Sequence, residues 1–240
     1  MPPQSVGGKP IILTCTECNN RHGSEIDVHV QRGRDLREIA EGKRPTWATL
    51  RLGENEITTK TTFGDKIEVV EVSGKSNPAC SEALAREFEE FVTSNTTDWS
   101  VDVSYTSRHD PWREQVAWLR AAYLTVFALL GYNYILRSEL NPIRDQFNQP
   151  DERIVPQIMK FMPTFDDETQ ILDVSQPADL RGFAVRLGKR LHFLPGFDHT
   201  HGFYDRLSAL PAKGRLQVTG VPLPRPRQPM FVCDRAMTDA

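Results

Sequence analysis

DPWREQVAWLRAAYLTVFALLGYNYIL, residues 110–136, is the stretch that decides the fold, because it predicts a long central helix. Asp110 is a favourable N-cap, and the proline that follows it fits the first helical turn. From Trp112 to about Leu136, apolar side chains lie nearly all round the helix, which is typical of a helix at the centre of a core. Its most apolar part is shorter than the roughly 20 residues that a bilayer span needs, and Asn133 interrupts it. We therefore expect a buried helix and no membrane partner.

The segments on either side of this helix predict an α+β fold. Residues 46–73 alternate and are rich in Thr, Val and Ile, which indicates two or three antiparallel strands. Alternation predicts a further strand over residues 98–106. The pattern is helical from Ser24 to about Glu41, with Ser24 as the expected cap. Other expected elements are a helix opening at Asn77-Pro78, an end or a short successor of the central helix at Asn141-Pro142, and strands at residues 183–187, 191–194 and 216–218.

We predict two parts in this chain. Residues 1–42 form a compact, turn-rich head, and residues 43–240 form a mixed α+β domain around the central helix. Arg120, Tyr123, Tyr132 and Tyr134 could form a polar face of that helix, but we expect the tyrosines to be buried with a hydrogen-bonded hydroxyl. The proline-rich stretch 222–229 predicts an extended arm.

Composition restricts the classes of function. The chain has 29 Lys and Arg against 32 Asp and Glu, a net charge of -3. A nucleic-acid binder usually carries a basic excess, so any basic surface here must be local. Four cysteines in 240 residues do not form a disulfide scaffold, and residues 1–10 lack the apolar segment of a signal peptide. We therefore expect a cytoplasmic protein.

A CxxC pair, Cys15 and Cys18, is the first candidate for chemistry. Two thiolates at this spacing can occupy one edge of a tetrahedral zinc site, but a structural site needs four ligands and the sequence offers no second CxxC. His22 and His29 are close in sequence but do not complete a known finger spacing. Two reduced thiols without metal are the alternative.

The wider string GGKPIILTCTECNNRHGSEID, residues 7–27, resembles the second half of a zinc-stabilised HNH nuclease finger, of the ββα-metal type. In that family a Gly-Gly turn precedes a strand, the strand delivers CxxC, and a helix follows. Residues 1–8 resemble the loop that joins the family's acid-His pair to this turn. Residues 118–135 resemble a helix in the carboxy-terminal part of certain bacterial HNH proteins. The remaining residues match only in general layout.

The resemblance implies a partial ββα-metal head and metal-dependent hydrolysis of phosphodiester bonds in DNA. It implies that Cys15 and Cys18 form half of a structural zinc site, and that Asn19, where the helix opens, binds Mg²⁺ or Mn²⁺. The family's general-base histidine, its acid and its other CxxC would fall immediately before residue 1. The resemblance therefore implies a protein that is catalytically deficient as given, which either a start codon assigned too late or a true short form would explain.

Four further residues are candidates without an assigned role. Asn20, Asp27 and His29 match positions that recur in the "CNNxxGSxxDxH" version of the family. Asp27 and His29 are two apart on a helix, so they do not share a face and a joint metal site is not expected. His22 lies one turn from Asn19 and could stand in as the base, although the family's base comes from a different strand. Asn19 could also be only a helix N-cap.

A second hypothesis belongs to another class of function. The chain could be a non-catalytic binding or regulatory protein that contacts a protein partner through its carboxy-terminal domain. This hypothesis predicts folding without metal and no cleavage of nucleic acid. Asp198-His199-Thr200-His201 has a metal-like spacing, but without a third ligand we interpret it as a loop with solvated histidines.

Overall fold

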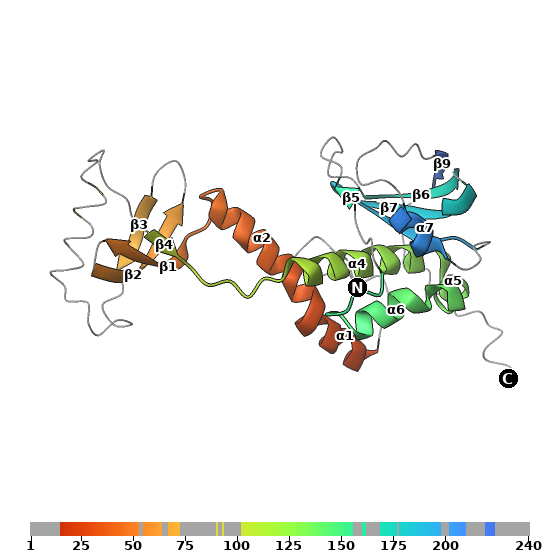
Figure 1. Cartoon of the computed structure of the whole chain (residues 1–240), viewed down its shortest axis with the longest axis horizontal. Helices are drawn as coiled ribbons and strands as arrows, with labels where there is room; N and C mark the ends of the chain where they lie inside the picture. Colours follow the sequence, from red (N-terminus) through yellow and green to blue (C-terminus); the bar gives the residue numbers. More distant parts are fainter. Residues whose placement is uncertain are drawn as a thin grey trace. The chain divides into compact units, whose positions relative to one another are not determined.

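The computed structural model of the chain describes the following residues: 15–52, 55–63, 67–72, 90, 93, 102–155, 160–161, 169–176, 178–197, 202–209 and 219–223 (Figure 1). The helix expected at residue 77, the strand expected at residues 216–218, the histidines of residues 198–201 and most of the proline-rich stretch lie outside them. Two compact units make up the chain. One contains residues 1–30 and 110–240, and the other contains residues 31–109. This division differs from the boundary at residue 42 that the sequence suggested.

One uninterrupted helical segment opens the described part of the chain. It consists of α1 (Thr16–His22), a π-helical turn (Gly23–Asp27) and α2 (Val28–Ala40). The expectation that the helix begins at Ser24 is therefore wrong. Ser24 lies inside the π turn, where its hydroxyl donates to the carbonyl oxygens of Asn20 and Arg21. A π turn holds one residue more than an α-helical turn, so it shifts the faces of α1 and α2 relative to each other.

The central helix, α4 (Pro111–Leu130), begins as expected. A carboxylate oxygen of Asp110 accepts hydrogen bonds from the backbone N–H groups of Trp112 and Arg113, at 2.8 and 3.1 Å. The helix ends six residues before the expected Leu136, because Gly131 has a φ of 70°. That left-handed conformation is open to glycine and ends an α-helix. The chain continues as α5 (Tyr132–Ile135), a 3₁₀ turn (Ser138–Leu140) and α6 (Asn141–Asn148).

A five-stranded antiparallel sheet packs on α4, in the strand order β5-β8-β7-β6-β9. Its strands are β5 (Lys160–Phe161), β6 (Thr169–Gln176), β7 (Gly182–Leu187), β8 (Arg190–Pro195) and β9 (Thr219–Pro222), with the short helix α7 (Phe203–Ala209) beside it. Strands β7 and β8 confirm the two strands predicted at residues 183–187 and 191–194. Gly182 is required in β7, since a Cβ atom there would lie 2.2 Å from the carbonyl oxygen of Leu194.

The core of this unit lies between α4 and the sheet, and Figure 1 shows α4 running along one face of it. Tyr123 and Tyr134 are buried, and their hydroxyls donate to the carbonyl oxygens of Ile135 and Pro195, at 3.2 and 2.9 Å, as predicted. The same prediction is wrong for Tyr132, which is 56% exposed because it follows the end of α4 at Gly131. Within the described residues, no helix is both long and apolar enough to cross a bilayer.

The second unit contains a four-stranded antiparallel sheet in the order β3-β2-β1-β4. Its strands are β1 (Thr46–Leu52), β2 (Asn55–Phe63), β3 (Ile67–Val72) and β4 (Asp102–Ser104). The antiparallel strands predicted from residues 46–73 are therefore confirmed, and β4 lies within the strand predicted at residues 98–106. Thr59 and Thr61 are buried on one face, and their hydroxyls form a 2.6 Å hydrogen bond.

Candidate functional site

The cysteine pair lies at the first turn of α1, and both thiols are exposed. Cys15 is the N-cap, and its sulfur accepts a hydrogen bond from the backbone N–H of Cys18 at 3.2 Å. The side-chain hydrogen bond with Cys18, followed by this backbone bond, lowers the pKa of Cys15. The same side-chain bond raises the pKa of Cys18. The thiolate is the form of cysteine that binds metal ions, and the hydrogen bonds from Cys18 favour this form at Cys15.

Asn19 lies in the interior of the helix, and its backbone N–H donates to the carbonyl oxygen of Cys15 at 2.9 Å. It is therefore neither the first helical residue nor a cap, since Cys15 takes the cap position. Residues three and four apart share a helix face, so Cys15, Cys18 and the half-buried Asn19 lie on the same side of α1. Asn20 is exposed on a neighbouring side.

His22 is buried rather than presented to solvent. Its ring contacts the ring of Phe147 edge-on, with the ring centroids 6.2 Å apart. Burial lowers the pKa of His22 to about 4, and the positive charges of Arg120 and Arg21 add to the effect. A neutral imidazole packed against a phenyl ring is not placed to activate water for a substrate at the surface.

This environment predicts an acid sensitivity that His22→Leu removes. Below its ordinary pKa of 6.5, His22 binds a proton in the unfolded chain, whereas the folded chain binds it only near pH 4. The unfolded state therefore binds more protons in this window, and stability falls as pH falls from 6.5 towards 4. Urea unfolding at pH 7 and pH 5 should show the wild type losing about 1–2 kcal/mol more than the variant. Equal losses would contradict the assignment of His22.

Asp27 lies in the π turn and forms a buried ion pair with Arg120 of α4. Arg120 Nη1 donates to Asp27 Oδ2, and only 9% of Asp27 and 4% of Arg120 are exposed. Burial raises the pKa of Asp27, and the charge and hydrogen bond of Arg120 oppose that rise. This carboxylate therefore fixes the π turn to the central helix and faces the core.

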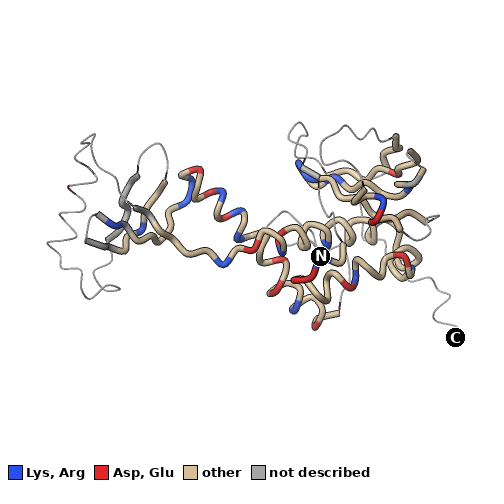
Figure 2. The backbone as a smooth tube through the Cα atoms, in the orientation of Figure 1, with Lys and Arg blue, Asp and Glu red and all other residues tan. Residues whose placement is uncertain are grey.

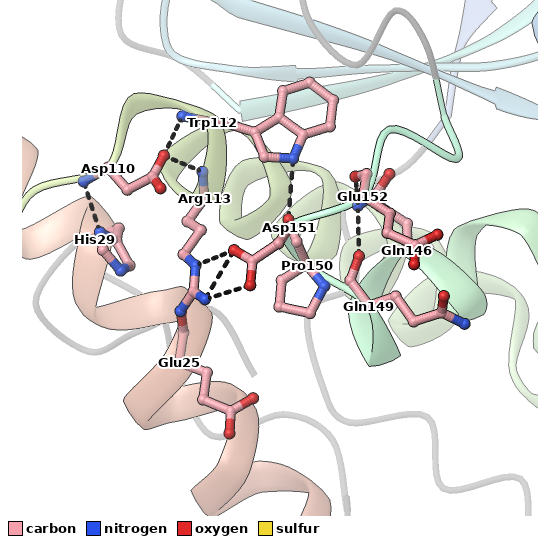
Figure 3. Close-up of polar contacts among 10 residues, drawn as sticks. All are labelled: Glu25, His29, Asp110, Trp112, Arg113, Gln146, Gln149, Pro150, Asp151 and Glu152. Carbon is pink, nitrogen blue, oxygen red and sulfur yellow. Dashed lines mark hydrogen bonds and ion pairs between the residues drawn. The ribbon is translucent and has the colours of Figure 1, made fainter.

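His29 is also buried and also contacts the start of α4. Its Nδ1 accepts a hydrogen bond from the backbone N–H of Asp110 at 2.8 Å, which is drawn in Figure 3. Arg113 donates to the carbonyl oxygen of Glu25 at 3.1 Å and to both carboxylate oxygens of Asp151 at 2.8 Å. Polar contacts of Glu25, Asp27 and His29 therefore join the π turn and the start of α2 to α4 and its cap.

Asp27 contacts Arg120 and His29 contacts the backbone of Asp110, so the two side chains use different partners. Within the described residues, no three His, Cys, Asp or Glu side chains lie close enough to hold a metal ion. The structure thus brings Cys15, Cys18 and Asn19 together at the surface and turns His22, Asp27 and His29 inward.

Charge along α2 is mixed rather than basic, as Figure 2 shows. Within α2, Arg34 pairs with Glu38, and Asp35 pairs with Arg44, which lies just after the helix. Lys43 and Glu41, also just after the helix, pair with each other. Each pair neutralises a cation that could otherwise contact a phosphate. The local basic surface expected of a nucleic-acid binder is therefore not provided by this helix.

Sequence reasoning placed Arg120 only on a possible polar face, and it did not single out Gln146. Gln146 in α6 is fully buried, and its amide bonds four backbone groups of the loop that follows. For Arg120, the available signal was a charged residue inside the most apolar helix, because a buried charge requires a partner of opposite charge.

No family model, no curated protein and no solved structure matches the chain. Its function therefore has to be inferred from the chemistry of its own residues.

Proposed function

We propose that this chain is an HNH-type, metal-dependent phosphodiesterase that acts on DNA, with Cys15 and Cys18 as zinc ligands. The observation that supports the proposal is which residues of the family-like segment are exposed and which are buried. Cys15, Cys18 and Asn19 share one side of α1, where both thiols are exposed. Asp27 in the π turn and His29 in α2 are buried and contact α4 or its cap. A site that cleaves DNA needs metal ligands that the substrate can reach and a rigid framework that holds them in position, and this segment of the chain provides both.

The thiols fit zinc as a pair. Both are exposed, they are one turn apart, and the N–H of Cys18 supports negative charge on the sulfur of Cys15. Thiolates are preferred ligands of Zn²⁺, which would hold the head in shape when bound. A structural zinc site takes four ligands, so this pair is half of one.

Asn19 would supply an amide oxygen to Mg²⁺ or Mn²⁺, and that ion would stabilise the charge on the scissile phosphate. The base that activates water comes from neither His22, which is buried against Phe147, nor His29, whose Nδ1 accepts from Asp110. By resemblance, it is a histidine on a strand next to the helix. The chain's own contribution is to hold Asn19 at a fixed place beside the thiol pair.

A plasmid-nicking assay with Mg²⁺ or Mn²⁺ tests the proposal. The 240-residue chain should nick poorly, and a version extended through the coding sequence upstream of Met1 should nick well. In the extended version, Asn19→Ala should lower the rate about 10- to 100-fold, the range seen when a group that supports a metal site is lost. Asn133→Ala is the matched control, because Asn133 is exposed in α5. Absence of nicking in every form, or equal rates for both variants, would exclude the nuclease.

A non-catalytic binding protein is the second candidate, and exposed apolar side chains near α5 favour it. Tyr132, Leu136 and Phe197 are exposed, Leu136 by 73%. The Phe197 ring contacts the ring of Tyr134 at 5.7 Å between centroids, so it is held in place. Large exposed apolar side chains are typical of a protein contact. This candidate gains support if nicking is absent and EDTA leaves urea unfolding unchanged.

A further inference from the structure

Neither helix capping nor packing explains the two cysteines at the start of α1. Cys15 is the N-cap, and Cys18 is the third residue of the helix. Serine, asparagine and aspartate are better N-caps than cysteine. Free cysteine is also among the residue types most often buried, whereas both of these thiols are exposed. A chemical role of the two sulfur atoms is the explanation that is left.

The cap conformation brings the two side chains together. Cys15 has an extended backbone, with φ -61° and ψ 142°, and its side chain folds back over the first turn. Its sulfur lies 3.2 Å from the backbone nitrogen of Cys18, and the two thiols also form a hydrogen bond with each other. Helix geometry places Cα atoms three positions apart at about 5 Å, inside the range of about 4.4–6.8 Å that disulfides take. The pair can therefore form a disulfide while the helix stays in place.

We propose that Cys15 and Cys18 form a reversible disulfide by exchange with a small organic disulfide of the glutathione class. One sulfur of the pair attacks a sulfur of the small disulfide, a mixed disulfide forms, and one small thiolate leaves and takes up a proton. The other sulfur of the pair then attacks the mixed disulfide. The bond between Cys15 and Cys18 forms, and the second small thiolate leaves and takes up the other proton. The two cysteines lose two electrons, and the small disulfide gains them as it becomes two thiols.

Access and proximity are the two conditions for this exchange, and the pair meets both. The first attack needs a sulfur that the small disulfide can reach, and both sulfurs are exposed. The second attack needs a neighbouring sulfur within reach, which the contact between Cys15 and Cys18 provides. A disulfide has no thiolate left to bind a metal ion, so oxidation would also exclude zinc from the pair. Only this last consequence rests on the proposed function, because the exchange itself requires neither zinc nor nuclease activity.

The test equilibrates the 240-residue chain with reduced or oxidised glutathione, in EDTA to remove metal ions. After acid quenching, the remaining thiols are alkylated in denaturant, and the tryptic peptides are analysed by mass spectrometry. The peptide that ends at Arg21 contains Cys15 and Cys18 but neither Cys80 nor Cys233, so it reports on the pair alone. It should carry two alkyl groups after reduced glutathione and lose both after oxidised glutathione, without gaining glutathione. Return to reduced glutathione should restore both groups.

Variants separate the two attacks. Cys15→Ser and Cys18→Ser should each carry glutathione on the remaining cysteine, because no second sulfur is present to expel it. Cys15→Ser/Thr16→Cys is the matched control, since it keeps two thiols but places them two positions apart, where helical side chains do not face each other. This variant should lose the internal disulfide and carry glutathione instead. Circular dichroism checks that each variant keeps the helix content of the wild type.

Three results would overturn the proposal. Two alkyl groups retained in oxidised glutathione would mean that the pair does not react. Glutathione on the wild-type peptide in place of an internal bond would mean that the second sulfur cannot attack. Equal internal oxidation of Cys15→Ser/Thr16→Cys would mean that the cap geometry does not form the site. Zinc content and plasmid nicking are separate measurements, so each of these results leaves the proposed function to its own test.

Discussion

Asp27→Asn is expected to lower the free energy of unfolding by about 3–5 kcal/mol, the usual loss when one partner of a buried ion pair is removed. The asparagine side chain has nearly the shape of the aspartate side chain but carries no charge. Arg120 is 4% exposed, so its guanidinium would stay in the core without a counter-ion. The contact also joins the π turn to α4, so its loss should loosen the N-terminal helix from the rest of the unit.

Substitutions of Arg120 distinguish the cost of leaving a buried charge unpaired from the cost of lost packing. Arg120→Met alone should also be costly, because it leaves the raised-pKa carboxylate of Asp27 without its partner. The double variant Asp27→Leu/Arg120→Met should lose less than the two single variants together, since apolar side chains of similar size replace buried ion pairs well. Urea unfolding followed by circular dichroism measures all three. Additive losses would contradict a coupled pair.

Asp151→Asn is the matched control for this prediction. Asp151 also pairs with an arginine of α4, through the bonds to Arg113 drawn in Figure 3, but its side chain is 70% exposed. Exposed ion pairs contribute about 0–1 kcal/mol, because solvent screens the charges. A control loss as large as that of Asp27→Asn would show that burial does not decide the cost.

The central helix and most of the described strands could be predicted because their signals are local. Asp110 and Pro111 are next to each other in sequence and both act on the first turn. The strands β7 and β8 are joined by a tight turn, so their alternation and their pairing lie within a few residues. The end of α4 was missed because the apolar run continues past Gly131, and the φ of a glycine cannot be read from hydropathy.

The start of the first helix was missed for a different reason. Serine is a common N-cap and cysteine is not, so Ser24 was the stronger signal in sequence. In the structure the sulfur of Cys15 takes the cap position and the helix begins at Thr16. The π turn at residues 23–27 fits partners that are far away in sequence, since Asp27 contacts Arg120. A local pattern does not contain that information.

The same distinction applies to the candidate site. Cys15, Cys18 and Asn19 could be selected as candidates from residue type and spacing, but the resemblance placed the two cysteines before the helix, whereas the helix begins at Thr16 with Cys15 as its cap. The roles of Asp27 and His29 could not be predicted, because their partners Arg120 and Asp110 are more than eighty positions away. The resemblance supplied these positions without a role, and the packing of α4 gives them one.

Gln146→Leu is the other substitution expected to have a large effect, because one buried amide organises the loop after α6. The amide nitrogen donates to the carbonyl oxygens of Gln149 and Glu152, at 3.2 and 2.8 Å. The amide oxygen accepts from the backbone N–H groups of Ile154 and Val155, at 3.0 and 3.1 Å. Figure 3 shows Gln146 beside Gln149 and Glu152, near the Trp112 and Asp151 contacts.

Leucine has nearly the volume of glutamine and no hydrogen-bonding group, so the change removes the amide's hydrogen bonds to four backbone groups. The carbonyl oxygen of Gln149 still accepts from the backbone N–H of Glu152 at 3.2 Å. Each buried group left unsatisfied costs about 1–3 kcal/mol, and solvent can reach some of them as the loop opens. We therefore expect a total loss of about 3–4 kcal/mol in urea unfolding. Faster hydrogen exchange should be confined at first to the N–H groups of Ile154 and Val155.

Gln149→Leu provides the comparison, because the same residue type stands three positions later with an exposed side chain. Its backbone carbonyl still accepts from Gln146 after the substitution. Surface substitutions of this kind change stability by about 0.5 kcal/mol or less. If Gln146→Leu costs no more than Gln149→Leu, the loop is held by other contacts. In that case the Trp112 Nε1 bond to the carbonyl oxygen of Pro150, at 2.9 Å, becomes the contact to remove next.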